Sequence, residues 1–296
     1  MNKKQIEKAA KGVVEFIAAT EKDFEDWTKK NQFKIIKAIS DEISNGMPSE
    51  GGKVANNPTT QKFIASLPTK VRAALKKTGY LSKVDSYVRA FERVGQLQID
   101  LHKSVNSINA APIVSNLQRV WAQVTADNLA GQGMDNLLVY PLQQSLLTHA
   151  ASGVTLTELV NMIDDEMRGN AKNKNTVFAN QALQIGRDAL GQYDGAINGK
   201  IAQDFDLNAI VYVGSVVDDT RAQCERWLES EFILIADLQD EIDWAFSNGS
   251  GMIAGTTPAN FTSLRGGYSC RHEAIPIRVT PEQIAAGTLD VADNSE

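Results

Sequence analysis

Cys270 and His272 are separated by one residue, Arg271, in a chain that has only two cysteines and three histidines. Thiolate and imidazole groups are ligands for zinc, and they also form the nucleophile and base of thiol hydrolases. On an extended strand, side chains two residues apart project from the same face, about 7 Å apart, whereas the residue between them points the other way. The segment therefore predicts a candidate site, provided that folding brings Cys224 beside it.

Three arrangements of the two cysteines remain open from the sequence. Cys224, Cys270 and His272, with Asp218 or Asp219, form a conceivable zinc ligand set. Alternatively, Cys224 and Cys270 form a disulfide, although two cysteines in 296 residues fit a reducing compartment. Because the chain has no C-x-x-C pair, the sequence favours the third arrangement, in which both cysteines pack under a strand–helix corner and no cofactor is bound.

A thiol enzyme is the catalytic alternative. It would use Cys224 or Cys270 as the nucleophile, His272 as the base and Asp219 as the orienting acid. Residues two apart on one strand are poorly spaced for this chemistry, and the chain has no G-x-x-x-x-G-K-[ST] phosphate loop. The sequence therefore predicts no catalytic activity.

The arginines near these residues suggest a structural role instead. A guanidinium group forms paired hydrogen bonds with a carboxylate and is suited to joining separate segments. We therefore expect an ion-pair network that joins a helix, an acidic turn and the last strand. Its members are Arg187, Asp188, Asp218, Asp219, Arg221 and Arg271, with Thr220 inside the turn.

The elements that must position this site change in character along the chain. Up to about residue 150 the apolar residues recur at helical spacing and no segment is typical of a strand. A Gly-, Pro- and Asn-rich stretch at 45–60 predicts a loop or hinge, and a second break is expected near Ala111 and Pro112. Gly79 is expected to end one helix, and Pro141 is expected to interrupt any continuous helix around it.

Strand patterns enter only after Gly153. Thr155 and Glu158 form a capping-box pattern, and a long helix with four glycines is expected over 176–201. Because glycine weakens a helix interior, that helix must pack closely against something. Strands are expected at 207–214 and at HEAIPIRV, and a short helix opens at Thr280-Pro281 with Gln283 closing a second capping box.

These patterns predict an α+β fold with two regions. Residues 1–150 form a helical arm or bundle, and residues 151–296 form a mixed module of helices with a small sheet. No apolar run approaches the roughly 20 residues needed to cross a bilayer, so no membrane contact is expected.

Charge divides along the chain as well. The net charge is −6, but residues 1–100 carry +6 and the remaining residues carry −12. The basic first region is a candidate for contact with double-stranded DNA, although lysines on a helix face also serve solubility alone. The candidate contacts are Lys70, Arg72, Lys76 and Lys77.

Two motifs occur in a fixed order. VGSVVDDTRAQCERW, at 213–227, is a strand followed by an acidic turn and a Thr-Arg-x-x-Cys helix start, and GYSCRHEAIPI, at 267–277, is a Cys-Arg-His segment entering a strand. Together with the helix pair Arg187-Asp188, this series resembles the phage minor head proteins typified by the F protein of phage Mu, over about residues 155–278.

The resemblance implies a structural role in a tailed bacteriophage. It implies a minor head protein of the virion, associated with the portal of the capsid and acting in head morphogenesis, with a part in DNA packaging or delivery. The expected partners are the portal or other head proteins, and the protein would be made in the host bacterial cytoplasm. The alternatives are the metal-dependent or cysteine-based enzyme described above and a helical adaptor outside the virion.

Overall fold

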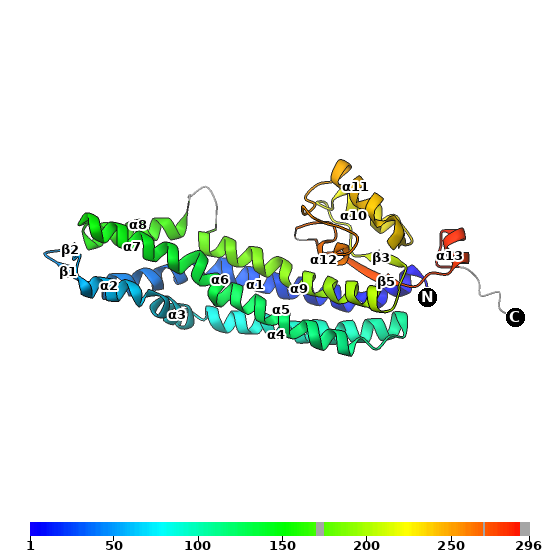
Figure 1. Ribbon diagram of the computed structural model, residues 1–296, viewed down its shortest axis with the longest axis horizontal. Coiled ribbons are helices and arrows are strands. Elements are labelled where there is room, and N and C mark those ends of the chain that lie inside the picture. The colour runs from blue at the N-terminus through cyan, green and yellow to red at the C-terminus, as the bar shows by residue number, and fades with distance from the viewer. Residues whose placement is uncertain (170–174, 269, 291–296) are drawn as a thin grey trace. The chain divides into compact units, whose positions relative to one another are not determined.

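The computed structural model describes residues 1–169, 175–268 and 270–290, and its elements are labelled in Figure 1. The protein is α+β, with long helices and a small antiparallel sheet, as the sequence predicts. None of the helices in these ranges combines the length and apolar character needed to cross a membrane.

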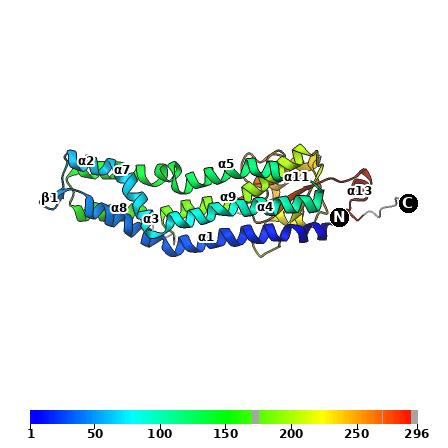
Figure 2. The same cartoon turned by 90° about the horizontal axis from the view of Figure 1, so that it is seen from below.

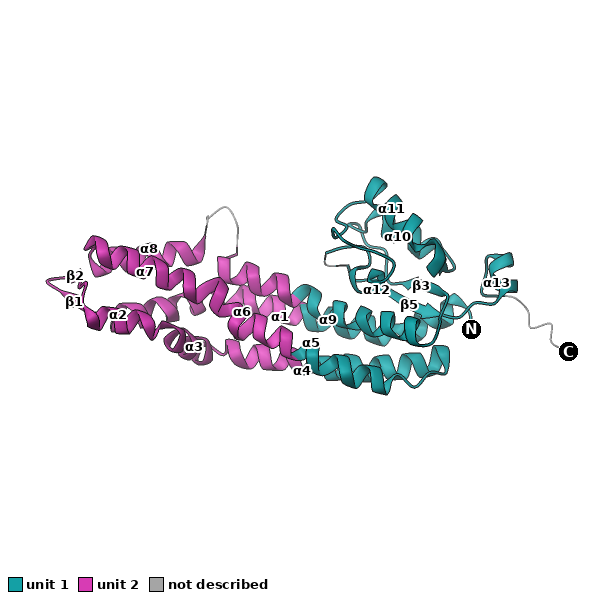
Figure 3. Ribbon diagram, in the orientation of Figure 1, with its two compact units in different colours: residues 1–21, 89–122, 187–296 teal, residues 22–88, 123–186 magenta. Residues whose placement is uncertain are grey.

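The chain folds into two compact units (Figure 3). Unit 1 consists of residues 1–21, 89–122 and 187–296, and unit 2 consists of residues 22–88 and 123–186. Each unit takes residues from both sides of residue 150, where the sequence predicts a domain boundary, and that boundary stays a prediction. The long helices that supply residues to both units are α1 (Lys3–Gly46), α4 (Tyr80–Asn106), α5 (Ala111–Ala130) and α9 (Val177–Asp204), with α4 and α5 separated at the expected break.

Unit 2 is almost entirely helical. Its aromatic side chains pack together, with the rings of Phe24 and Tyr87 4.8 Å apart and those of Tyr80 and Phe178 4.9 Å apart. Its other elements are β1 (Ser49–Glu50), β2 (Lys53–Val54), α2 (Pro58–Ala65), α3 (Leu67–Thr78), α6 (Gln132–Met134), a π-helical turn (Asp135–Val139), α7 (Tyr140–Ser152) and α8 (Leu156–Arg168).

The loop expected at 45–60 contains a short hairpin, so the prediction of no strand before residue 150 was wrong. Ser49 pairs with Val54 in the antiparallel β1–β2 pair. The turn between the strands is Gly51-Gly52, and both glycines have positive φ, as a type I′ hairpin turn requires. Two-residue strands are too short to produce a readable alternation of apolar and polar residues.

The expectation that Pro141 interrupts the helix was also wrong. Helical backbone runs from Gln132 to Ser152, with the π-helical turn directly ahead of α7. Pro141 is the second residue of α7, and the wider π-helical turn precedes it. Because a π-helical turn changes the hydrogen-bond pattern directly ahead of Pro141, the helix continues past a residue that has no N–H to donate.

Three terminal signals in the sequence are confirmed. Thr155 and Glu158 cap α8 reciprocally, and Thr280 and Gln283 do the same for α13 (Pro281–Ala286). Gly79 ends α3 with φ of 87°. The sequence could predict these helix ends because each depends on one residue or on two residues three positions apart.

Unit 1 combines parts of the long helices with the sheet. Within this unit, α1, α4 and α9 run side by side (Figure 2). Polar side chains join two of them, since His102 on α4 and Asn198 on α9 form a 2.8 Å hydrogen bond. The further elements are β3 (Ala209–Val213), α10 (Ala222–Glu229), β4 (Ile233–Leu234), a 3-10 turn (Ile235–Asp237), α11 (Leu238–Asn248), α12 (Phe261–Leu264), β5 (Glu273–Ile277) and α13.

The sheet has the strand order β4-β3-β5, and both pairings are antiparallel. Every residue of β3 and β5 is buried, so the sheet lies inside the unit with its β-branched side chains in the core. The core beside it is aromatic, since Trp227 packs edge-on against both Tyr212 and Phe261. This core holds α10, and therefore Cys224, against the sheet.

Candidate functional site

The pairing of β3 with β5 places the acidic turn beside the Cys-Arg-His segment. Val213, the last residue of β3, pairs with Glu273, the first residue of β5. Gly214 consequently lies against His272, and a Cβ at position 214 would be 2.4 Å from the imidazole Cδ2 atom. Gly214 also has φ of 148°, so this position suits glycine on both steric and backbone grounds.

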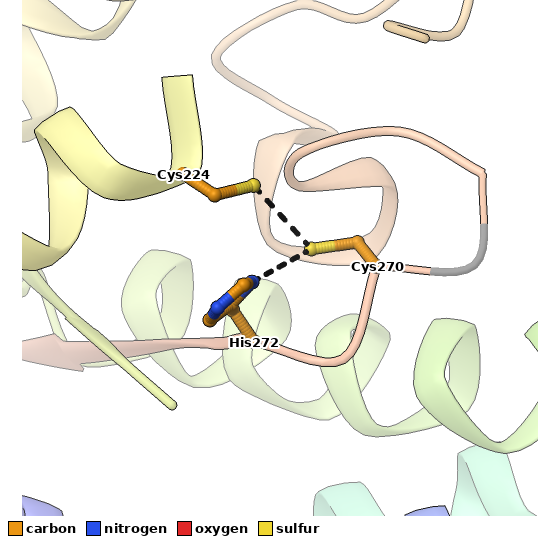
Figure 4. Close-up of side chains that lie close together, drawn as sticks. All are labelled: Cys224, Cys270 and His272. Atoms are coloured by element: carbon orange, nitrogen blue, oxygen red, sulfur yellow. Dashed lines mark hydrogen bonds between the residues drawn. The ribbon is translucent and has the colours of Figure 1, made fainter. Parts of the chain in front are cut away.

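The two cysteines and His272 converge, as the sequence analysis required (Figure 4). Cys224 comes from the first turn of α10, and its Sγ is 4.0 Å from Cys270 Sγ. Cys270 Sγ is 3.5 Å from His272 Nδ1. The expectation that Cys270 and His272 lie on a strand was wrong, because β5 begins at Glu273 and both residues are in the preceding loop.

Tyr212 and Gly266 enclose the sulfur atoms. The Tyr212 hydroxyl is 3.2 Å from Cys270 Sγ and 3.6 Å from Cys224 Sγ, and its ring stacks on His272 with centroids 5.5 Å apart. A Cβ added at Gly266 would be 2.2 Å from Cys224 Sγ. Both cysteines are free thiols, so the structure does not contain the disulfide that the sequence left open.

The hydrogen bonds of His272 orient its ring. Nε2 is 3.2 Å from the carbonyl oxygen of Ser215. Because a carbonyl oxygen can only accept, Nε2 is the nitrogen that carries the proton in the neutral ring. The lone pair of Nδ1 therefore faces Cys270 Sγ.

The two thiols differ in acidity. The hydrogen bond with Cys224 holds the pKa of Cys270 well below the ordinary thiol value, and the charge of Arg265 adds to this effect. The same hydrogen bond, together with burial, raises the pKa of Cys224.

Arg221 and Gln223 tie the loop before Cys270 to α10. The Arg221 guanidinium donates to the carbonyl oxygens of Gly266, at 2.8 Å, and Tyr268, at 2.6 Å. The Gln223 amide donates to the carbonyl oxygens of Ser250, at 2.7 Å, and Gly266, at 3.1 Å. Side chains from one helix start thus satisfy backbone carbonyls from two loops.

This arrangement corrects the expected ion-pair network at the turn. Arg221 bonds to carbonyl oxygens, whereas Asp218 and Asp219 are exposed. Exposed carboxylates keep their hydration, so pairing there would contribute little. Thr220 closes the turn, since its hydroxyl accepts from the backbone N–H of Val217 at 2.7 Å.

The other predicted residues lie around the same site. Arg187 and Asp188 are on α9, where they line a small cavity that Cys270 also lines. Arg271 is exposed and faces a larger cavity of about 400 Å³. That larger cavity is also lined by Asp219, Cys224 and His272.

Sequence reasoning missed Arg265, which is only 4% exposed. It donates to the carbonyl oxygens of Gly191 and His272, and its guanidinium is 3.7 Å from the Asp194 carboxylate. A signal was present in α9, because Asp194 falls on the apolar stripe between Leu190 and Ile197. A carboxylate on a buried stripe requires a cation or hydrogen-bond donors.

The basic DNA candidates lie on α3, in unit 2. Lys70 lies over the Phe63 ring, 5.1 Å from its centroid, and Arg72 pairs with Asp135 at 3.2 Å. Lys76 and Lys77 are exposed in the last turn of the helix.

Comparison of the chain with known proteins gives no match. No family model, no curated protein and no solved structure matches it.

Proposed function

We propose that the protein is a minor structural component of a tailed-phage head, associated with the portal and acting in capsid assembly. The proposal depends on the resemblance over residues 155–278. The observation that supports it is the joining of the two motifs: Arg221 and Gln223 bond to backbone carbonyls of the loop that leads to Cys270. A joint that is held in a fixed shape suits a docking module, because such a module acts by binding.

The burial of Cys224 also supports a scaffold. Cys224 is 2% exposed, and its sulfur is enclosed by Gly266 and the Tyr212 hydroxyl. A nucleophile must reach a substrate, whereas a packed thiol must exclude one. Cys224 therefore contributes to the core of the docking module.

DNA is the second partner of this proposal. Of the four basic candidates, Lys76 and Lys77 are the exposed ones that neither stack on a ring nor pair with Asp135. They are the best placed to meet phosphate groups, and contacts of this kind would make DNA binding strongly salt-dependent.

Retention by the portal protein tests the proposal. Beads carrying the portal protein of the same phage should retain the chain from a cleared lysate, and beads carrying the major capsid protein serve as the matched control. Retention on the portal beads above the control is the expected result. Equal retention on both, at the level of empty beads, would remove the proposed docking role.

A thiol- or metal-dependent enzyme is the second candidate function. It is favoured by one observation: Cys270 Sγ and His272 Nδ1, 3.5 Å apart, belong to residues that line the cavity of about 400 Å³. Alkylation of metal-free protein by a bulky maleimide separates the candidates. An enzyme predicts fast modification of Cys270 in the folded protein, and a scaffold predicts modification only on unfolding.

A further inference from the structure

Cys224, Cys270 and His272 bring three metal-ligating atoms close together. The three atoms lie within 4.8 Å of one another, although the residues come from α10 and from the loop before β5. Two soft sulfur ligands and one imidazole are a ligand set that zinc prefers. This grouping is the only one of its kind among residues 1–169, 175–268 and 270–290.

Two of the three distances between ligand atoms are close to those of a tetrahedral site, and the third is within 4.8 Å. With Zn–S bonds of about 2.3 Å and Zn–N bonds of about 2.05 Å, a tetrahedron places two sulfurs about 3.8 Å apart and sulfur and nitrogen about 3.5 Å apart. The observed values are 4.0 Å for the two Sγ atoms and 3.5 Å for Cys270 Sγ and His272 Nδ1. Binding would require Cys224 Sγ to move toward His272, since the three atoms now lie within 4.8 Å of one another.

The surrounding groups orient the ligands as in known metal sites. A metal-bound histidine usually donates its other ring N–H to a carbonyl or carboxylate, which fixes the ring and its tautomer. Here Nε2 faces the Ser215 carbonyl oxygen at 3.2 Å and leaves Nδ1 free for a metal. The Tyr212 hydroxyl, 3.2 Å from Cys270 Sγ, can donate to the bound thiolate.

We infer that Cys224 Sγ, Cys270 Sγ and His272 Nδ1 bind one divalent cation of the zinc class, with its fourth position facing the neighbouring cavity. That cavity is lined by all three ligands and by Asp219, so water or a carboxylate can complete the coordination. On binding, each protonated thiol releases its proton to solvent as its sulfur bonds to the metal. The inference does not depend on a phage role.

Such a metal would join α10, the helix that follows the acidic turn, to the loop before β5. Cys224 and Cys270 are 46 residues apart in the chain. A metal that binds only the folded protein stabilises it, and removing the metal must therefore lower its stability.

Cobalt spectroscopy of the reduced, full-length wild-type chain is the first test, and it requires no variant that has to fold. The metal-free protein is titrated with Co²⁺ alone. We expect thiolate-to-cobalt charge-transfer absorption and intense tetrahedral d–d bands that saturate at one equivalent, and Zn²⁺ should bleach both. Octahedral, weakly absorbing cobalt would overturn the inference.

Metal content of purified variants is the second test. Cys270→Ser and His272→Gln should each lower Zn²⁺ affinity by more than about a hundredfold, beyond the loss typical for removing an outer partner. His149→Gln, which changes a histidine in unit 2, should leave the affinity unchanged. Unchanged zinc binding in Cys270→Ser, or a Cys224–Cys270 disulfide in protein isolated under thiol-trapping conditions, would contradict the inference.

Discussion

The guanidinium of Arg221 donates to two carbonyl oxygens in the loop that precedes Cys270. A hydrogen bond from a charged donor contributes more than one from a neutral donor. Arg271, only one residue after Cys270, is exposed. At the scale of single residues, then, two arginines in similar motifs have different physical roles.

Replacing Arg221 with alanine should lower the free energy of unfolding by about 2 kcal/mol, or the melting temperature by roughly 5 °C. The loss comes from the two charge-assisted hydrogen bonds to Gly266 and Tyr268. Thermal unfolding followed by circular dichroism measures it. Arg271→Ala is the matched control and should shift the midpoint within error; a larger loss for Arg271→Ala than for Arg221→Ala would refute the assignment.

The sequence indicated which residue types meet at the site and missed how they are held. Cys224, Cys270 and His272 were chosen because their chemistry is rare in this chain, and the structure brings them together. Arg265 was missed because the sequence alone does not distinguish a buried arginine from an arginine on the surface. Its partner, Asp194, lies 71 residues earlier, and no local pattern links them.

Between α4 and α9 in unit 1, buried polar side chains form a two-step ladder. Gln98 donates to Asp194, and four residues further along both helices His102 bonds to Asn198. All four are essentially unexposed, and burial lowers the pKa of His102 to about 4. At the scale of elements, matching pairs at helical spacing fix the register of the two helices.

Asp194 should make stability depend on pH. Burial raises its pKa to about 6 despite Arg265, so the folded state favours the protonated carboxyl. An acid with a raised pKa destabilises the fold as the pH rises from the unfolded value, near 4, to the folded value. Asp194→Asn should therefore gain about 1 kcal/mol relative to wild type between pH 5 and pH 7.5.

Urea unfolding at the two pH values measures this difference. Asp100→Asn on α4 is the control, because Asp100 is exposed and Asn can still accept from Gln96. Its difference from wild type should be the same at both pH values. A pH-independent difference for Asp194→Asn would show that Asp194 is ionised throughout the range.

The glycines of α9 let other segments approach its backbone closely. A Cβ at Gly195 would lie 2.0 Å from the carbonyl oxygen of Thr262, and one at Gly199 would lie 2.7 Å from the Thr262 hydroxyl. The sequence analysis expected close packing from the number of glycines, and this expectation is confirmed. It could not identify α12 as the neighbour, because sequence spacing carries no information on distant contacts.

Gly195→Ala should destabilise the protein by about 2 kcal/mol or more, because the added methyl group overlaps backbone that cannot move aside easily. Gly12→Ala on α1 is the matched control. Its Cβ would meet only Leu97, at 3.9 Å, so helix propensity alone should stabilise that variant slightly. Equal tolerance of both changes in denaturant titrations would show that α12 does not pack on α9 as described.

At the scale of the whole molecule, the residue pattern predicted the fold class, but it did not predict which segments group into each unit. Long helical stripes and a few β-branched runs were enough to predict α+β. Unit 1, however, collects residues from three separated stretches, and averages taken along the chain cannot detect such a grouping. Segments of this kind are joined by contacts such as the pairing of β3 with β5, which the sequence suggests only as two isolated strands.

The proposed place of the protein is inside a phage particle, and quantitative mass spectrometry of purified particles tests that place most directly. Particles from cells that encode this chain would be banded by density, treated with protease to remove adhering protein, and compared with an equal fraction from cells lacking the gene. We predict a small, constant number of copies per particle that stays with the portal after the particles are disassembled. Complete recovery of the chain outside the particles would contradict the account.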